Sequence, residues 1–225
     1  MTIKNKTRLI NWIGILFAIW LFIFPVFYKS IILINILIPI IGILFAYKLK
    51  GKIGIDSRKW GESSIPKIDS AIIFPSLSLI LRALKDIKVI DYTTIHIFSI
   101  LISLPLVCIL LLGTKEYLSR RKIGYVILWI IIFTSTFGYG TTILLNSILD
   151  KSKTEYYKSK VFGKEIEKST KGGTSYRIDF EPWGPVEEKD YMRISKYEFT
   201  KIKINDSIEL KLKKGFLGSS WIPTK

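Results

Sequence analysis

The sequence predicts an α-helical integral membrane domain of four transmembrane helices plus one interfacial or re-entrant helix, followed by a small antiparallel β-barrel or sandwich-like domain. The first observation behind this prediction is that four long apolar runs fill the first two-thirds of the 225 residues. The second is that apolar residues begin to alternate with polar ones after Asp150, as they do in strands. The chain therefore divides into a membrane domain over 1–149 and a β-rich domain over 150–225.

Each apolar run has about the length that a membrane-spanning helix needs, ~20 residues for a hydrocarbon core about 30 Å thick. Lipid offers no partner to backbone N–H and C=O groups, so such runs form helices. The first run follows basic residues, as in a secretion signal, but it is too long and has no small-residue cleavage site. We therefore expect it to be retained. The predicted spans cover residues 9–28, 31–47, 95–113 and 125–145.

Residues 71–87 form an ambiguous segment, because their uninterrupted apolar part is too short to cross a membrane comfortably. On a helix, one polar stripe contains Ser78, Arg82, Lys85 and Asp86, and the opposite face is apolar. This pattern predicts a helix that lies in the membrane interface, or a re-entrant helix capped by Pro75. The alternative is a fifth span in which the Arg82 side chain extends to the head groups.

The distribution of Lys and Arg predicts a cytoplasmic N-terminus, because cytoplasmic loops carry the excess of basic residues. With four spans the inner loops hold 12 basic residues and the outer loops 5, whereas with five spans the counts are 13 and 4. The two alternatives place the β-rich domain on opposite sides of the membrane. The polar stripe favours four spans and a cytoplasmic β-rich domain. A chain so rich in Lys and Ile is typical of bacteria, which predicts a bacterial inner (plasma) membrane.

Alternation of apolar and polar residues predicts half-buried strands at 176–180 and 208–212. Lys171-Gly172-Gly173 suits a hairpin turn between a strand near 157–168 and one at 174–181, which includes the first of these segments. Five or six short strands in this part of the chain predict a compact antiparallel barrel or sandwich. We expect this domain to fold on its own.

The formal net charge of +16 divides into +11 over 1–149 and +5 over 150–225. Most of the excess lies in short loops beside apolar runs, where basic residues set topology and attract anionic head groups. We therefore expect the lipid bilayer as a partner and no nucleic acid. A protein partner or a homo-oligomer is also compatible with this composition.

The residues predict no catalytic, cofactor-binding or metal-ligating set. His96 is the single histidine, which excludes HExxH metal sites and multi-His metal centres. Cys108 is the single cysteine, which excludes an intramolecular disulfide and a cysteine-rich metal site. No phosphate-binding loop or nucleophile elbow is present in the sequence. We therefore expect a protein that is not an enzyme.

Two tryptophans are candidates for a binding surface. Trp183 lies in the motif Glu181–Pro185 and Trp221 closes the motif Gly215–Trp221, and the Pro and Gly residues of both motifs predict turns. The two rings could plug the ends of a small barrel, or they could contact a ligand or lipid together with nearby lysines. The sequence leaves both alternatives open.

A ridge of small residues in the last apolar run predicts close helix packing. Thr134, Gly138 and Thr142 recur at four-residue spacing, and such ridges let two helices approach closely. The neighbouring helix could belong to the same chain or to a second copy.

Several short motifs lie at a characteristic spacing along the chain. They are Leu81-Arg82-Ala83-Leu84, Asp150-Lys151-Ser152, Tyr176, Pro182-Trp183-Gly184, Ser195, Tyr197, Asp206, Gly215, Leu217-Gly218 and Trp221. In these motifs the chain resembles the C-terminal part of uncharacterised bacterial multi-pass membrane proteins with a small C-terminal β-domain. The resemblance covers about half of the chain and carries no assigned activity.

Together these features predict a membrane-anchored interaction or accessory module whose β-rich domain binds a protein, an envelope component or a lipid. The alternative is a subunit of an oligomeric transporter or channel, and a membrane enzyme is the third hypothesis. The apolar runs contain no acidic residue, lysine or arginine outside 71–87, which argues against an ion-coupled transporter.

Overall fold

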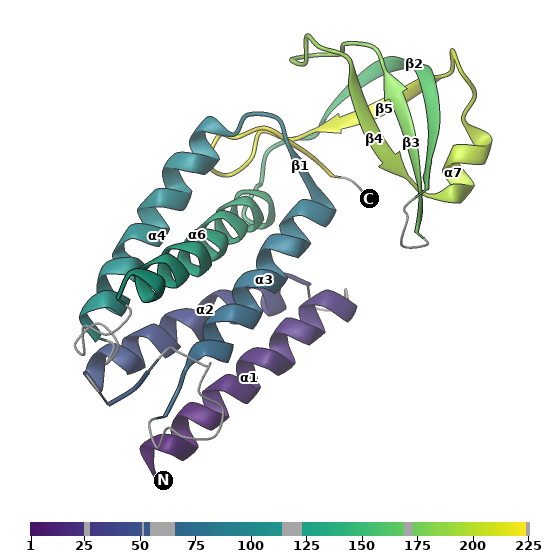
Figure 1. The fold of residues 1–225 in the computed structure, drawn as a ribbon. Coiled ribbons are helices and arrows are strands. Elements are labelled where there is room, and N and C mark those ends of the chain that lie inside the picture. Colours follow the sequence, from purple (N-terminus) through teal and green to yellow (C-terminus); the bar gives the residue numbers. More distant parts are fainter. Residues whose placement is uncertain (25–27, 51, 55–65, 114–122, 169–172, 224–225) are drawn as a thin grey trace.

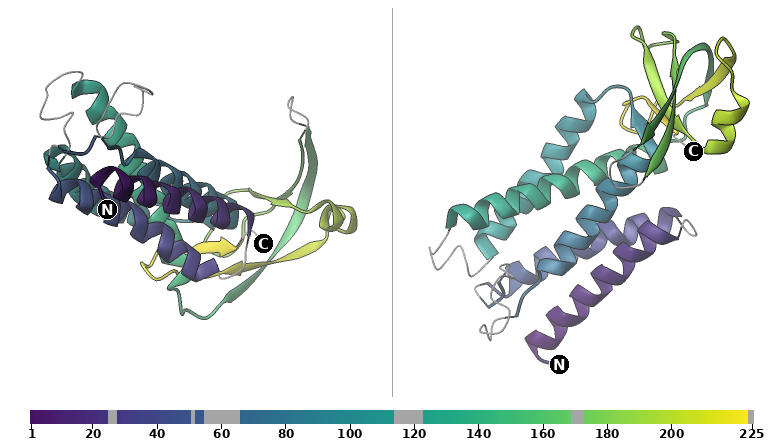
Figure 2. Two further views of the ribbon diagram at one scale, coloured as in Figure 1. Left: turned by 90° about the horizontal axis from the view of Figure 1, so that it is seen from below. Right: turned by 45° about the vertical axis from the view of Figure 1, so that its right-hand side comes forward.

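The structure, a computed structural model, consists of a bundle of long helices that carries a strongly curved β-sheet at one end (Figure 1). Successive helices run in alternating directions, and the N-terminus lies at the end of the bundle that is far from the sheet (Figure 1). Figure 2 shows the helical bundle and the sheet at its end from two further sides. The residues that the structure describes are 1–24, 28–50, 52–54, 66–113, 123–168 and 173–223.

Five long helices form the described part of the bundle, and four of them are long and apolar enough to cross a membrane. These four overlap the four predicted spans and indicate a multi-pass membrane protein, although the first helix ends at Ile23 and not at residue 28 as predicted. The apolar helices are α1 (Ile3–Ile23), α2 (Tyr28–Lys48), α4 (Thr93–Gly113) and α6 (Ile123–Ile148).

The remaining long helix, α3 (Asp69–Asp86), comes from the ambiguous segment and lies lengthwise among the others. It packs against α1, α2 and α6. The approach to α6 is close, because a Cβ added at Gly140 would lie 2.7 Å from the backbone nitrogen of Ile80. The interfacial or re-entrant position expected for this segment is therefore not confirmed.

The C-terminal part forms an antiparallel four-stranded sheet in the order β4-β3-β2-β5, curved into a half-barrel. The expected antiparallel β-rich fold is confirmed, but a closed barrel is not. The predicted hairpin joins β2 to β3 as expected, although most of the turn Lys171-Gly172-Gly173 lies outside the described residues. The strands are β2 (Glu155–Lys168), β3 (Thr174–Phe180), β4 (Asp190–Ile194) and β5 (Ser207–Leu212).

A second, two-stranded sheet lies in the neck between the bundle and the half-barrel. It pairs β1 (Ile87–Val89), which follows α3 directly, with β6 (Trp221–Pro223) near the end of the chain. The last strand of the β-rich domain therefore has its partner inside the segment 1–149.

A β-bulge in β2 reverses the side to which its residues point. The register shifts between Val161 and Gly163, so even-numbered side chains point outward before the bulge and odd-numbered ones after it. The inner face packs into a small core around Val161, Ile178 and Phe180. The short helix α7 (Lys196–Lys201) lies over one end of this core, where the Phe199 ring contacts the Tyr176 ring at a centroid distance of 5.2 Å.

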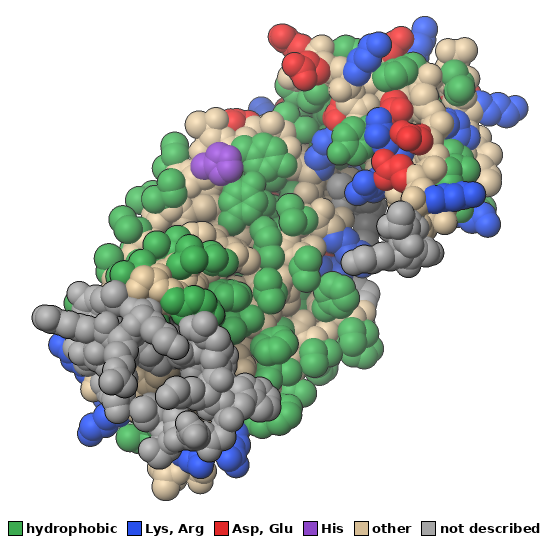
Figure 3. Space-filling model, viewed as in Figure 1, with side chains coloured by type: hydrophobic (Ala, Val, Ile, Leu, Met, Phe, Trp, Pro, Cys, Tyr) green, Lys and Arg blue, Asp and Glu red, His purple; other side chains and the backbone are tan. Residues whose placement is uncertain are grey.

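The surface of the helical bundle differs from that of the half-barrel. Hydrophobic side chains cover the middle of the bundle on the face shown in Figure 3, and Lys and Arg side chains gather toward its ends. The half-barrel carries both acidic and basic side chains on the same face (Figure 3). Such an apolar band between charged ends is typical of a protein that crosses a membrane.

Candidate functional site

The end of α6 is enclosed by a loop from the C-terminal end of the chain. Asn146 is fully buried there, and its side-chain amide donates to the Ser219 carbonyl oxygen at 2.8 Å. The amide oxygen of Asn146 accepts from the Leu217 backbone N–H at 2.9 Å, and its backbone carbonyl accepts from the Phe216 N–H at 2.9 Å. The loop thus satisfies polar groups that the end of a helix otherwise exposes to water.

Asp150 lies one turn beyond Asn146 and connects the end of α6 to β6. We call the contacts of Asn146 and Asp150 with residues 215–221 the junction. Its carboxylate accepts hydrogen bonds from the Trp221 indole N–H at 2.9 Å, the Gly215 N–H at 3.2 Å and the Ser152 N–H at 2.7 Å. Burial alone would raise the pKa of Asp150, but the hydrogen bonds from Ser152, Trp221 and Gly215 outweigh it and lower the pKa below its ordinary value. The carboxylate is therefore stabilised in its charged form.

A second connection joins the neck to the half-barrel. The Lys88 ammonium of β1 forms an ion pair with Asp190 of β4 and also donates to the Tyr191 carbonyl oxygen at 2.9 Å. On the other side, the backbone groups of Lys213 and Trp221 pair at 3.0 and 2.9 Å and link β6 to the end of β5. The Lys88 side chain, and no strand pairing, connects β1 with β4 among the described residues, so the barrel is not closed there.

Both candidate tryptophans are buried in the structure. Trp183 contributes to the inner core of the half-barrel, where its ring lies 5.6 Å from the Tyr157 ring, and Gly184 takes a positive φ of 46° in the tight turn beside it. Trp221 packs against the hydrophobic core of the helical bundle. The two rings lie in different cores, so the structure does not bring them together into one exposed surface.

The ridge of small residues on α6 lies against α4 of the same chain. A Cβ added at Gly138 would lie 2.1 Å from the Ser103 hydroxyl oxygen and 2.7 Å from the Ser99 carbonyl oxygen. The Ser103 hydroxyl also donates to the Thr134 carbonyl oxygen at 2.9 Å. Thr142 is buried, and its hydroxyl donates to the Gly138 carbonyl oxygen at 2.7 Å.

The outer face of the half-barrel carries a mosaic of opposite charges on β2, β3 and β4. The Arg177 guanidinium binds the Asp179 carboxylate at 2.7 Å and lies 3.4 Å from Glu165 and 3.5 Å from Glu167. Arg193 binds Glu167 at 2.8 Å. Ion pairs at a protein surface contribute little to stability, so these pairs alone do not account for the fold of the sheet.

Next to this mosaic lies a surface that we call the basic strip, composed of Tyr156, Lys158, Lys160 and Lys211. The first three alternate along β2 and are exposed, and Lys211 of β5 is paired with Tyr156 in the strand register. Within the described part of the chain, none of the three lysines forms an ion pair, although Glu209 is the register partner of Lys158. The strip is therefore a positive surface with an aromatic side chain at one end.

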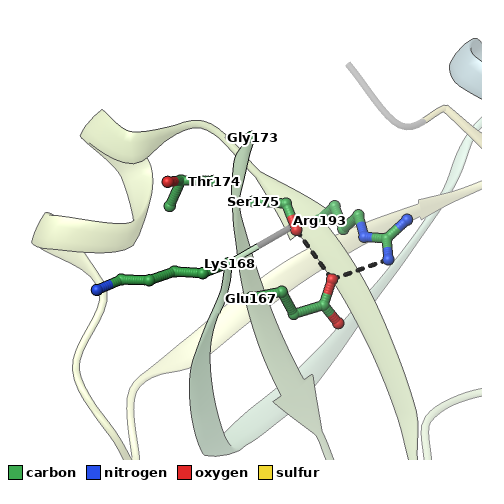
Figure 4. Close-up of a pocket in the computed structure, with 6 residues that line it drawn as sticks. All are labelled: Glu167, Lys168, Gly173, Thr174, Ser175 and Arg193. Carbon is green, nitrogen blue, oxygen red and sulfur yellow. Dashed lines mark hydrogen bonds and ion pairs between the residues drawn. The ribbon is translucent and has the colours of Figure 1, made fainter. Parts of the chain in front are cut away.

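A pocket of about 390 Å³ lies at the hairpin end of β2 and β3 (Figure 4). Ser175 and Arg193 both donate to the same oxygen of Glu167, at 2.9 and 2.8 Å, and these hydrogen bonds lower the pKa of Glu167 below its ordinary value. Three of the polar side chains of the pocket are thus engaged with one another, which favours a structural role for them. Its lining residues are Glu167, Lys168, Gly173, Thr174, Ser175 and Arg193.

The described residues include no cluster of three His, Cys, Asp or Glu side chains that could hold a metal ion. His96 lies at the start of α4 between two aromatic rings, with centroid distances of 6.0 Å to Tyr92 and 5.7 Å to Tyr139. Aromatic residues gather in this way where a helix enters the head-group region. Cys108 is exposed on α4.

Some residues of the junction escaped the sequence-based prediction. Asn146 and Asp150 stand out as polar residues at the end of an apolar run, but nothing local reveals that their partners lie about 70 residues further along the chain. Lys88 and Asp190 carried no signal at all, because ordinary charged residues become partners only when two strands fold together.

Comparison with known proteins found no match: no protein-family model, no curated protein and no solved structure resembles this chain closely enough to be recognised. The geometry of the junction, the basic strip and the mosaic is therefore the basis on which a function can be argued.

Proposed function

We propose that this protein is a non-enzymatic, membrane-anchored interaction module in which the basic strip of the half-barrel binds an acidic segment of a protein partner. The observation that carries this proposal is the contrast between the two faces of the sheet. The inner face is filled by its own core, whereas the outer face presents three lysines without ion pairs in the described part of the chain.

The neighbouring mosaic favours a protein over a uniform polyanion as the partner. Glu165, Glu167 and Asp179 lie on the same outer face and would repel a chain that carries only negative charge. A folded protein can instead present an acidic group to the strip and a basic group to the mosaic. Such complementarity gives specificity as well as fast association.

The junction supports the idea that the bundle positions the half-barrel. Asn146 and Asp150 tie the C-terminal loop to α6, and Lys88 ties the neck to β4. A surface held rigidly at the bilayer loses less conformational entropy when it binds than a domain on a flexible tether.

We place the protein in a bacterial plasma membrane with the N-terminus in the cytoplasm. The bilayer is then its first partner, and basic residues around the N-terminal end of the bundle would contact anionic head groups. We also propose, on the matching motifs of the sequence alone, that it belongs with the uncharacterised bacterial multi-pass proteins that it resembles. The ridge at Gly138 packs inside one chain, so it lends no support to an oligomeric channel.

The test is site-specific photo-crosslinking of the full-length protein in its native membrane, with the photoreactive residue at Tyr156. We expect a protein adduct that is lost in the double variant K158E/K160E and retained in K196E/K201E, a matched double charge reversal on α7. Mass spectrometry should place the adduct on an acidic segment of the partner. Adducts that contain only lipid, or adducts that persist in K158E/K160E, would contradict the proposal.

A further inference from the structure

We infer that α3 is a fifth membrane crossing, whose exposed face contacts lipid acyl chains and whose passage places the half-barrel across the bilayer from the N-terminus. This inference is independent of the partner proposed above. The exposed face consists of Phe74, Leu77, Leu81 and Leu84.

The polarity of α3 is the reverse of that of a helix on a water-soluble bundle. Ser78 and Arg82, from the polar stripe, are only 5% and 6% exposed, whereas Leu81 and Leu84, from the apolar face, are 50% and 60% exposed. In water an amphipathic helix buries its apolar face and exposes its polar one. An apolar face that points away from the protein is stable where the surrounding solvent is itself apolar.

The contacts at the two ends of α3 show that it traverses the depth of the α1–α2 hairpin. At its start, the Asn11 side chain of α1 accepts from the Ala71 N–H at 3.1 Å and donates to the Lys67 carbonyl oxygen at 3.0 Å. At its end, the Tyr28 hydroxyl at the start of α2 donates to the Asp86 carboxylate at 2.9 Å. Since α1 and α2 cross the membrane between these levels, α3 crosses the same layer.

The length of α3 and its charges fit a crossing. Its 18 residues give a helix about 27 Å long, close to the ~30 Å hydrocarbon core. Arg82 and Lys85 both lie in its last two turns, near the head-group region. Arg82 is neutralised by Asp86 at 2.6 Å, and its guanidinium lies 5.0 Å from the centre of the Tyr28 ring. Burial of a charge in a membrane protein requires such a partner.

Lipid is the occupant that the surroundings of this face favour. The neighbouring candidate spans also expose apolar side chains, such as Leu16 of α1 and Leu128 of α6. Figure 3 shows hydrophobic side chains over the middle of the bundle. With five crossings, 13 basic residues flank the cytoplasmic ends of the helices and 4 flank the outer ends. The half-barrel is then extracytoplasmic, opposite to the side that four spans predict.

Cysteine labelling tests the crossing, in a full-length background with Cys108→Ala. Cysteines at Lys4 and at Tyr197, an exposed residue of α7, are treated with a membrane-impermeant maleimide in spheroplasts. We expect Tyr197→Cys to react in intact spheroplasts and Lys4→Cys to react only after permeabilisation. Reaction of both residues from the same side would overturn the inference.

A second measurement tests the occupant of the exposed face. A nitroxide attached at Leu81→Cys, in vesicles of phosphatidylethanolamine and phosphatidylglycerol, should collide more often with oxygen than with a water-soluble nickel chelate. The matched reference for lipid exposure is Leu101→Cys on α4, which is 61% exposed inside a candidate span. Preferential access of the nickel chelate, or an oxidative disulfide between two copies at Leu81→Cys, would overturn lipid as the occupant.

Discussion

The indole N–H of Trp221 donates a 2.9 Å hydrogen bond to the carboxylate of Asp150, across 71 positions in the sequence. This bond joins β6 to the end of α6, and Trp221 packs at the same time against the core of the bundle. The junction is therefore held by both apolar packing and a hydrogen bond to a charged acceptor, a class that contributes about 1.5–3 kcal/mol when it is buried.

Trp221→Phe should destabilise the protein by about 1.5–3 kcal/mol, because phenylalanine keeps most of the ring but loses the N–H donor. The measurement is the free energy of unfolding in mixed micelles. Trp12→Phe is the matched control, since Trp12 is 57% exposed on α1, and we expect it to change stability by no more than about 0.5 kcal/mol. Equal effects of the two substitutions would show that the indole bond contributes nothing.

Stability should fall in acid partly through Asp150. A carboxyl group whose pKa is lower in the folded protein contributes stability that is complete above its unfolded pKa of about 3.9. This stability is lost as the pH falls through the lower folded pKa. Unfolding free energies measured between pH 7 and pH 3 should decrease less in Asp150→Asn than in the wild type. Parallel curves would mean that Asp150 is not linked to unfolding.

Gly215→Ala should be more damaging than Gly218→Ala. Both glycines have a positive φ, 77° and 79°, which costs a residue with a Cβ about 1–2 kcal/mol. A Cβ at Gly215 would also lie 2.3 Å from the Ser219 carbonyl oxygen and 2.5 Å from the Asn146 side chain, whereas one at Gly218 meets nothing within 4 Å. Protease protection of the loop around Phe216 would report the difference. A similar loss in both variants would contradict the close fit around Asn146.

Gly138→Ala should lower stability without changing the oligomeric state, because the added Cβ would collide with Ser99 and Ser103 of α4. Gly124→Ala is the matched control on the same helix, since its Cβ meets nothing within 4 Å and alanine favours a helix by about 1 kcal/mol. Unfolding and particle mass in detergent should be measured together. A change of mass at unchanged stability would instead assign the ridge to self-association.

Much of the architecture could be predicted because its causes are local. Apolar runs without charge predicted the four candidate spans, since a helix is the way in which such a run satisfies its backbone in lipid. Alternation at 176–180 and 208–212 predicted strands that the structure places in β3 and β5. Trp183 and Trp221 were recognised as special, but their burial in two different cores was not predictable from the turns around them.

The basic strip illustrates what local patterns cannot supply. Lys158 and Lys160 point outward only because the bulge lies after them, and a bulge depends on the pairing of β2 with β3. The outward position of Lys211 likewise depends on the register of β5 against β2. A shift of one residue in either pairing would turn these side chains toward the core.

The sequence by itself determined that this chain has long apolar helices followed by an antiparallel β-rich part, because hydrophobic length and periodicity are properties of neighbouring residues. Only the tertiary structure decided how these parts meet: the position of α3 among α1, α2 and α6, the pairing of β1 with β6, and the contact of Asp150 with Trp221. The stripe of Ser78 and Arg82 is compatible with water on a surface or with a polar interior. Whether the stripe meets water or a polar interior depends on helices that are distant in the sequence and on the solvent around the bundle. The residues of the stripe determine neither of these surroundings.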